Sequence, residues 1–518
     1  MTAKMCARES LTSQELVKES LTVAQQATHI SLIKETGKLM KLTLTDAETQ
    51  PILTELADSN AKFSTTYPGD SSDRQQVHTV YGGANLFKAG SAQKLGGIAL
   101  RNLDTYAPNF CALAKVIGFP GAETLPSADA EIAVLAAACA EDSEKMKGLN
   151  TPAWLAHTVY ERITAKLKNE PIEDNRIDFE DGYGNRPDDE EDADAIRCAE
   201  EVAKGIEEGN LPPFIGIRIK TFSEECRQRS VRTLDLFLTR LSEVNGGKLP
   251  NNFIVTLPKV THPEQVTALT KLLDVLEEKC GYEKNSLKLE IMIETTQSII
   301  DDAGDNQVYN LVKAANGRCR SAIFGTYDYT ATCNITAAYQ THTHPACDFA
   351  RHVIQVSLAG TGITLSDGAT TTMPIGPHRA AADKPLTNEQ MLENTRVVHS
   401  AWKLHFDNVR HSLAHAYYQG WDLNPAQLPI RYAAVYSYFL EGLPDASKRL
   451  SAFINKAAQA TLVGNTFDDA ATGQGLLNFF LRGIACGAIT EEEATSTGIT
   501  MDELRSRSFV NIVANRTK

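Results

Sequence analysis

The stretch FIGIRIKTFSEECRQRSVRTLDLFLTRLSEVNGGKLPNNFIVTLPKV, residues 214–260, contains the unit on which the fold prediction rests. Residues 214–220 and 253–260 are short runs of β-branched and other apolar residues, a composition typical of buried strands. Between them, residues 230–244 carry leucine, valine and phenylalanine at helical spacing. A strand, a helix and a second strand in this order indicate a βαβ unit of a parallel sheet.

The same alternation of strand and helix extends through most of the chain. Further helices are predicted between strands, for example at residues 191–209 and 262–280. Eight strands with intervening helices predict an α/β protein with a (β/α)8 TIM barrel. A doubly wound open sheet stays an alternative, because periodicity does not show whether a sheet closes. The six further strands are predicted at residues 76–83, 176–181, 287–295, 321–329, 362–368 and 416–423.

The predicted elements divide the chain into three parts. Residues 1–70 form an N-terminal helical extension, residues 71–424 the TIM barrel, and residues 425–518 a C-terminal helical region. A long helical stretch separates the first two predicted strands, so the barrel is expected to contain a helical insertion at about residues 85–172.

Composition limits the partners of the chain. Its 518 residues carry a net charge of −14, which argues against nucleic acid and anionic membrane surfaces. No apolar run reaches the length of a membrane span, and the first residues lack a signal-peptide pattern. The ten cysteines are scattered without a CxxC pair, which indicates reduced thiols. We therefore expect a cytoplasmic protein that acts on a small molecule, with no nucleic-acid and no membrane partner.

Two carboxylates stand at the ends of neighbouring predicted strands. Glu294 follows the apolar run LEIMI, and Asp328 lies near the end of the strand predicted at 321–329. Active sites of barrels lie at the carboxyl ends of the strands, so we expect both side chains in one small volume. Their repulsion calls for a divalent ion, and oxygen ligands favour Mg²⁺ or Mn²⁺ over zinc. Because either carboxylate alone is also explained as a helix cap or a loop acceptor, the metal prediction depends on the pair.

Two basic residues also stand at predicted strand ends. Arg218 is an isolated charge in an apolar run, and it could pair with Asp178 or Glu180. It could equally stabilise an enolate or hold a substrate carboxylate, which suits its planar guanidinium. Lys259 is a candidate Schiff-base lysine, but a structural or electrostatic role near the substrate is preferred.

The second predicted strand ends in the acidic sequence DFEDGYG, residues 178–184. Residues two apart share a face of a strand, so Asp178 and Glu180 are predicted to point together and Asp181 to point away. The acidic run that follows, RPDDEEDADA, is interpreted as a solvated stretch. Glu180 and Asp181 are predicted to form a substrate-binding rim of the active site.

Six short motifs follow one another in a consistent order. They are DFEDGYG (178–184), IGIRIK (215–220), TLPKV (256–260), IMIETTQS (291–298), IFGTYDYTA (323–331) and GWDLNPAQLPIRYAAVY (420–436). In this order the chain resembles the citrate lyase β superfamily, which includes the HpcH/HpaI aldolases, and more loosely the malate synthases. The resemblance covers roughly residues 170–480.

The resemblance implies a TIM barrel that binds Mg²⁺ through Glu294 and Asp328. It also implies that the metal chelates an oxo-acid or related carboxylate, while Arg218 stabilises an enolate. Such a protein is a metal-dependent carbon–carbon lyase, either an aldolase acting on free oxo-acids or a Claisen-type enzyme acting on an acyl-CoA thioester. A cation and a guanidinium are both suited to stabilising an enolate.

Several members of the superfamily take a general base from their C-terminal helical region, in some cases from a neighbouring subunit. The corresponding sequence is GNTFDDAATGQGLL, residues 464–477, which makes Asp468 and Asp469 the candidates and implies a homo-oligomer. Either residue could instead cap the helix that begins at Ala470. Asp422, in the eighth-strand motif, is a further candidate and a predicted substrate-binding residue.

The chain departs from the superfamily at two motifs. Asn424 stands where the eighth-strand motif usually has a histidine, and the first strand lacks the usual arginine. His78, or Arg74 upstream of it, is predicted to take the arginine's part in substrate binding. Two functions of other classes remain open: a catalytically silent barrel subunit, and a metal-dependent phosphotransfer enzyme that uses phosphoenolpyruvate.

One histidine pattern stands apart from these motifs. His342 and His344 alternate as metal ligands can on a strand, but no third ligand stands at a familiar spacing. A position at the rim of the pocket is therefore preferred over metal binding.

Overall fold

The computed structural model describes residues 43–69, 73–381, 384–455, 461–463, 466–468, 470–506, 512 and 516. The chain divides into two compact units, Met1–Thr65 and Thr66–Lys518. The described helix of the first unit is α2 (Asp46–Thr66), none of whose side chains is buried. Residues 1–42 of the predicted N-terminal extension lie outside the described residues.

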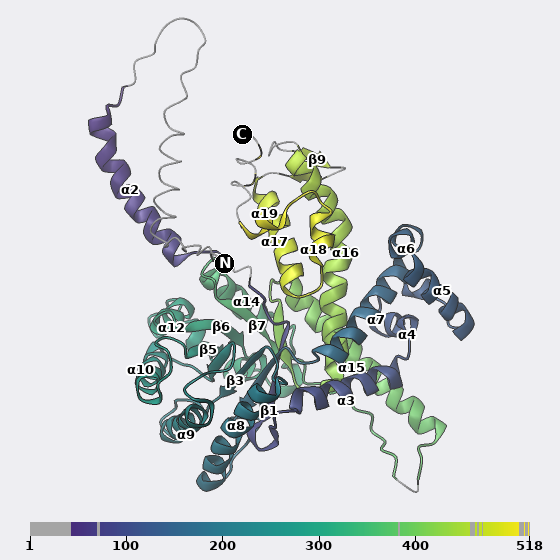
Figure 1. Cartoon of the computed structure of the whole chain (residues 1–518), viewed down its shortest axis with the longest axis horizontal. Helices are drawn as coiled ribbons and strands as arrows, with labels where there is room; N and C mark the ends of the chain where they lie inside the picture. Colours follow the sequence, from purple (N-terminus) through teal and green to yellow (C-terminus); the bar gives the residue numbers. More distant parts are fainter. Residues whose placement is uncertain are drawn as a thin grey trace, which may run out of the picture. The chain divides into compact units, whose positions relative to one another are not determined.

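Eight parallel strands form a closed barrel in the second unit (Figure 1). Each strand pairs with the next one along the chain, and β1 also pairs with β8, where Val80 lies opposite Asp422. The predicted TIM barrel is therefore confirmed, and the alternative of an open sheet is excluded. The strands are β1 (His78–Gly83), β2 (Asp174–Asp178), β3 (Phe214–Arg218), β4 (Phe253–Leu257), β5 (Lys288–Ile293), β6 (Cys319–Phe324), β7 (Thr364–Ala369) and β8 (Gln419–Asp422).

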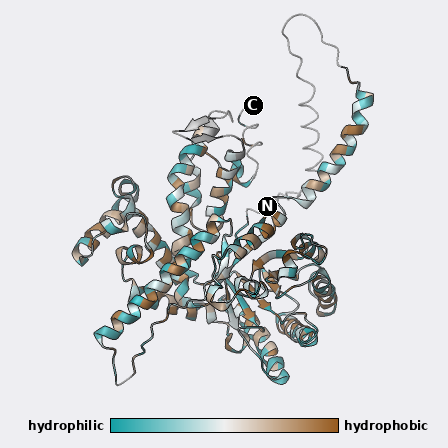
Figure 2. Ribbon diagram, turned by 180° about the vertical axis from the view of Figure 1, so that it is seen from behind, coloured by the Kyte–Doolittle hydropathy of each residue, from teal (hydrophilic) through white to brown (hydrophobic). Residues whose placement is uncertain are grey.

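Helices cover the outside of the barrel because each presents one apolar face to it. In α9 (Arg227–Asn245), Leu234, Phe237, Leu238 and Leu241 recur at spacings of three and four residues and are fully buried. Removing each side chain from water contributes about 1.5–3 kcal/mol. Figure 2 shows hydrophobic and hydrophilic residues side by side on these helices. The other covering helices are α8 (Asp188–Glu208), α10 (Pro263–Cys280), α12 (Val308–Ala314), α14 (Pro345–Leu358) and α15 (Asn388–Ala414).

A second hydrophobic core joins the helices inserted between β1 and β2 to α15 and to α16 (Leu428–Asn455). Trp402 of α15 is fully buried there, and its indole N–H donates a hydrogen bond of 2.8 Å to the carbonyl oxygen of Ala426. The inserted helices are α3 (Ser91–Tyr106), α4 (Phe110–Ile117), α5 (Asp129–Glu141), α6 (Ser143–Leu149) and α7 (Thr151–Asn169).

The sequence pattern predicts a wholly helical C-terminal region, but the structure also contains two short strands there. Strands β9 (Thr461–Val463) and β10 (Thr466–Asp468) form an antiparallel pair before α17 (Ala470–Ala485). None of the described helices combines the length and the hydrophobicity needed to cross a membrane. The remaining short helices are η1 (Ala84–Leu86), η2 (Ala122–Thr124), α11 (Thr296–Ile299), α13 (Thr326–Thr332), η3 (Ala337–Tyr339), η4 (Pro425–Gln427), α18 (Glu491–Thr495) and α19 (Met501–Arg505).

Candidate metal centre at the carboxyl end of the barrel

Glu294 and Asp328 lie at the carboxyl ends of neighbouring strands. Glu294 directly follows β5, and β5 pairs with β6 up to Ile293 opposite Phe324. The predicted strand 321–329 is too long, because β6 ends at Phe324 and Asp328 lies in the first turn of α13. The two carboxylates nevertheless reach the same end of the barrel, where active sites of this fold lie.

Gly325, between β6 and α13, leaves the space that the Glu294 carboxylate occupies. A Cβ atom at Gly325 would come within 2.2 Å of Glu294 Oε2 and 2.5 Å of its Cβ. Since the second of these atoms belongs to the rigid part of the side chain, no residue with a Cβ fits without displacing Glu294.

Glu294 is a buried carboxylate in a negatively charged neighbourhood. It is 1% exposed, and its Oε1 accepts a hydrogen bond of 2.7 Å from the backbone N–H of Lys259. Burial and then the charge of Asp328 raise the pKa of Glu294 to about 8. Burial also raises the pKa of Asp328. Ionising this pair therefore costs free energy, which a divalent cation bound to both oxygens would offset.

Lys259 links the acidic residues that follow β2, β5 and β6. Its Nζ donates to Glu180 and, at 3.0 Å, to Asp181, and it lies 3.9 Å from Asp328 Oδ1. The backbone φ of Lys259 is 51°, in the left-handed region that side chains rarely adopt. In this conformation the backbone N–H of Lys259 binds Glu294, and its ammonium group binds the loop after β2.

The loop after β2 differs from the predicted strand. Because β2 ends at Asp178, Glu180 and Asp181 lie in a turn and do not alternate between the two faces of a strand. Both carboxylates contact the Nζ of Lys259. The prediction that Asp181 points away from Glu180 is wrong for this reason.

Arg218, the last residue of β3, is held by carboxylates along its edges and by two neighbouring aromatic rings. Asp178 accepts hydrogen bonds from its Nε, at 2.7 Å, and from one terminal nitrogen. The other terminal nitrogen lies 3.2 Å from Glu180 Oε2. The guanidinium carbon lies 4.8 Å from the ring centroid of Tyr81 and 5.2 Å from that of Trp421. Such contacts fix the position of the cation before any ligand binds.

The described residues of the centre carry more negative than positive charge. With every group ionised, as metal binding requires, five carboxylates and two cations give a formal charge of −3, counted as two minus five. Oxygen donors with excess negative charge fit a hard divalent cation such as Mg²⁺ or Mn²⁺. The seven groups are Asp178, Glu180, Asp181, Glu294, Asp328, Arg218 and Lys259.

His78 and Asp422 are not part of this centre, which corrects their predicted role in substrate binding. Both are fully buried on the side of the barrel that faces the helices. His78 Nδ1 lies 3.6 Å from Asp422 Oδ2, and the carboxylate accepts a hydrogen bond of 2.8 Å from Arg431 of α16. Arg74, the alternative to His78, pairs with Glu170 near the amino end of the barrel.

The candidate base Asp468 lies in β10, directly before α17. Asp469 lies outside the described residues, and only the backbone of Asp468, in β10, is described. β9 packs against α16 and β10 against α17. Figure 1 shows β9 at the end of α16 that lies away from the barrel strands. In α17, Arg482 donates a hydrogen bond of 2.6 Å to Gln75, which precedes β1 and so lies at the amino end of the barrel.

Tyr81 and Trp421 are site residues that the sequence prediction missed. They point into the barrel from β1 and β8, and their ring centroids are 4.4 Å apart. The available signal was their position two residues after Thr79 and Gln419, which also point inward and share a hydrogen bond.

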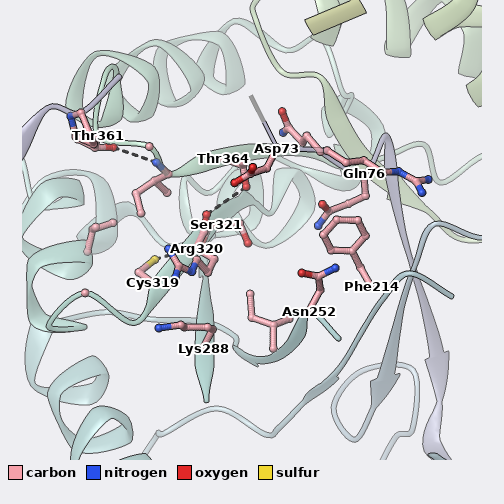
Figure 3. Close-up of a pocket in the computed structure, with 18 of the residues that line it drawn as sticks. Asp73, Gln76, Phe214, Asn252, Lys288, Cys319, Arg320, Ser321, Thr361 and Thr364 are labelled. Atoms are coloured by element: carbon pink, nitrogen blue, oxygen red, sulfur yellow. Dashed lines mark hydrogen bonds between the residues drawn. The ribbon is translucent and has the colours of Figure 1, made fainter. Parts of the chain in front are cut away.

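A cavity of about 810 Å³ lies at the other end of the barrel, around the first residues of several strands. Phe214, Lys288 and Cys319, which begin β3, β5 and β6, line it, as do Arg320 and Ser321 (Figure 3). None of the residues of the metal centre lines this cavity.

The fold and this cluster define a TIM barrel with a buried glutamate and a half-buried aspartate, Glu294 and Asp328, at its carboxyl end. The sequence profile of a family described as a domain of unknown function, DUF6986, matches residues 56–512. The chain therefore belongs to this family. A search of curated proteins finds no match.

Solved structures with similar folds include two groups of enzymes. A citrate lyase from Burkholderia xenovorans is 17% identical over 65% of this chain and 91% of its own, with a TM-score of 0.46. The protein CitE from Mycobacterium tuberculosis, in complex with magnesium, acetoacetate and coenzyme A, is 14% identical over 63% and 94%, with a TM-score of 0.39. A malate synthase from Haloferax volcanii is 14% identical over 67% and 89%, with a TM-score of 0.35.

Proposed function

We propose that this protein is a Mg²⁺- or Mn²⁺-dependent carbon–carbon lyase, or a Claisen-type condensing enzyme, that acts on an oxo-acid or acyl thioester through an enolate. The observation that carries the proposal is the pair Glu294 and Asp328, two carboxylates of raised pKa beside the immobilised Arg218. The six ordered motifs of the sequence support the same reaction class.

The two carboxylates would hold the metal ion. A divalent cation there would supply positive charge to the oxygens of the substrate, where negative charge develops as the neighbouring carbon–carbon bond breaks or forms. The hydrogen bond from the Lys259 backbone to Oε1 orients Glu294 for this role, and burial excludes water from the carboxylate.

Arg218 would stabilise the enolate oxygen. Asp178 occupies the Nε edge of the guanidinium. The terminal nitrogen near Glu180 is therefore the one that can donate a hydrogen bond to a substrate. Because the aromatic rings of Tyr81 and Trp421 already hold the guanidinium, little reorganisation is needed when charge develops. Lys259, Glu180 and Asp181 would shape the rim that admits the substrate.

The general base would come from a second copy of the chain in a homo-oligomer. The hairpin that contains Asp468 is attached to α16 and α17, and α17 contacts the amino end of its own barrel. The metal centre lies at the carboxyl end of that barrel. A base from this hairpin therefore reaches a metal centre more readily in a neighbouring subunit than in its own chain.

Calorimetric titration tests the proposal. Mg²⁺ with oxaloacetate, pyruvate or glyoxylate is titrated into wild-type protein, Glu294→Gln and the control Glu277→Gln. Glu277 is also a buried glutamate, but it pairs with Arg318 away from the centre. We expect metal-dependent oxo-acid binding in the wild type and the control, and none in Glu294→Gln. Equal binding in all three folded proteins, or in none of them, would contradict the proposal.

Product analysis then separates the remaining functions. Mg²⁺-dependent release of pyruvate or acetyl-CoA from a larger oxo-acid or thioester is the result expected of a lyase. Binding without turnover would instead indicate a catalytically silent subunit. Consumption of phosphoenolpyruvate with transfer of phosphate would indicate a phosphotransfer enzyme.

A further inference from the structure

A cluster of histidines lies outside the barrel, on helices α14 and α15. Asp348 and His352 are four residues apart in α14, and His411 of α15 lies four residues before His415, which caps the carboxyl end of that helix. Residues at this spacing lie on one face of a helix. One ligand atom each of Asp348, His411 and His415 lie within 4.8 Å of one another, and all three side chains are half-buried.

The hydrogen bonds of the cluster leave a nitrogen lone pair of His415 for a metal. His411 Nε2 lies 2.8 Å from Asp348 Oδ1, and the ring centroids of His411 and His415 are 4.2 Å apart. His415 Nδ1 lies 2.8 Å from the carbonyl oxygen of His411. A carbonyl oxygen only accepts, so Nδ1 carries the proton and Nε2 of the neutral ring keeps its lone pair. Histidines that bind metals commonly fix their second nitrogen in this way.

Asp348 is itself held in place by a second partner. Arg351 donates a hydrogen bond of 2.9 Å to the same Oδ1 and also binds Asp367 of β7. Arg351 is fully buried, so this arginine anchors the carboxylate to the barrel. The carboxylate is therefore oriented towards His411 by the fold and does not depend on the histidine for its position.

We propose that Asp348, His411 and His415 form a metal site for zinc, or for another transition ion that imidazole binds, which clamps α14 to α15. Ligands at the zinc distance of about 2.0–2.2 Å stand about 3.4 Å apart in a tetrahedron, so small side-chain rotations close the present cluster around an ion. His352, whose ring is stacked on that of His415 with centroids 5.4 Å apart, supplies the fourth ligand.

This site is chemically distinct from the metal centre of the barrel. Imidazole nitrogens select zinc, copper and nickel, whereas the oxygen donors of Glu294 and Asp328 select magnesium and manganese. Since the cluster lies between helices on the outside of the barrel, the ion would stabilise the fold and take no part in chemistry. The inference therefore stands or falls independently of the proposed function.

Equilibrium dialysis against zinc, with Mg²⁺ in excess to occupy the barrel centre, tests the proposal. The proteins are the wild type, the double variant His411→Gln/His415→Gln and the control His262→Gln. His262 is an exposed histidine at the start of α10, where its Nδ1 lies 3.0 Å from Glu264 of the same helix. We expect the wild type and the control to retain one zinc ion more per chain than the double variant. Equal zinc in all three proteins, or none in the wild type, would overturn the proposal.

Two further measurements, cobalt absorption and the Tm, test the same site. Cobalt in place of zinc should give the visible absorption bands of a tetrahedral nitrogen–oxygen site in the wild type and not in the double variant. If the double variant does not fold, His415→Gln alone serves, because the hydrogen bond that the His415 ring makes among the described residues goes to a backbone oxygen. Zinc should also raise the Tm of the wild type but not of the variant, and an equal rise in both would contradict the clamp.

Discussion

At the scale of single residues, Arg218 is the most constrained group of the metal centre. We predict that Arg218→Lys lowers kcat about 100- to 1000-fold, the usual effect of removing one donor to a developing oxyanion. Lysine keeps the charge but loses the bidentate hydrogen bonds to Asp178 and the cation–π contacts of the guanidinium with Tyr81 and Trp421. Steady-state turnover with the oxo-acid substrate measures the loss.

The affinity for Mg²⁺ distinguishes this role from a structural one. The variant should bind Mg²⁺ nearly as the wild type does, because Glu294 and Asp328 remain. A loss of metal binding equal to the loss of turnover would show that Arg218 maintains the structure of the centre and does not act on the substrate.

The pKa of Glu294 makes both metal binding and stability depend on pH. Its folded pKa of about 8 lies above the ordinary value of 4.5, so the metal-free folded protein holds a proton there that the unfolded chain has lost. The stabilisation is complete below about pH 4.5 and is lost as pH rises towards 8. Metal-free protein should therefore melt at a lower temperature at pH 8.5 than at pH 6, after subtraction of the same difference in Glu294→Gln.

Mg²⁺ should bind more weakly as pH falls below about 8, because the ion must displace this proton. Calorimetry in buffers of different ionisation enthalpy should detect proton release on binding at pH 7. Binding without proton release would show that Glu294 is already ionised in the free protein.

At the scale of elements, the turn from β6 to α13 shapes the centre. We predict that Gly325→Ala abolishes or strongly weakens Mg²⁺ binding, because the new Cβ would lie 2.2 Å from Glu294 Oε2. Gly82→Ala is the matched control, since a Cβ at this position of β1 meets no atom within 4 Å. Calorimetry with Mg²⁺ compares them, and equal binding by the two variants would contradict the assigned position of Glu294.

The strands β3, β4, β5 and β6 were predictable because each is a short, largely apolar run between helices of clear periodicity. Their ends were less predictable. The sequence after Phe324 is rich in aromatic and β-branched residues that favour a strand, yet Gly325 turns the chain into α13 at once. The loop after Asp178 was misjudged in the same way, because local composition does not show where a chain leaves a sheet.

The face on which a strand residue lies was harder still to predict. In a barrel covered by helices both faces of a strand are buried, so the alternation of apolar and polar residues that marks an exposed face is missing. The sequence therefore predicts His78 and Asp422 as residues of the centre. In the structure Tyr81 and Trp421 are the residues that point inward on the same strands. Deciding between the faces needs the partner side chains, which only the folded structure supplies.

At the scale of the whole molecule, the inside of the barrel is held by charges as well as by apolar packing. Arg176 of β2 binds Asp174 and lies 3.4 Å from Glu290 Oε1, and all three are buried. We predict that Arg176→Met lowers the free energy of unfolding by about 3–5 kcal/mol, because it leaves two buried carboxylates without their partner. Urea unfolding measures the change, and a loss below about 1 kcal/mol would show that the carboxylates take up protons at little cost.

The assembly of the chain decides where the general base comes from. The hairpin with Asp468 belongs to a region that contacts the amino end of the barrel, whereas Glu294 lies at the carboxyl end. If the base is supplied by a neighbouring copy, Glu294→Gln and Asp468→Asn/Asp469→Asn should each be inactive alone but regain activity when unfolded and refolded together. In a closed ring mixed at random, about a quarter of the sites combine an intact Glu294 with an intact neighbouring base. Turnover of the mixture near a quarter of the wild-type rate is therefore expected, and mixing without any recovery would place the base and the metal in the same chain.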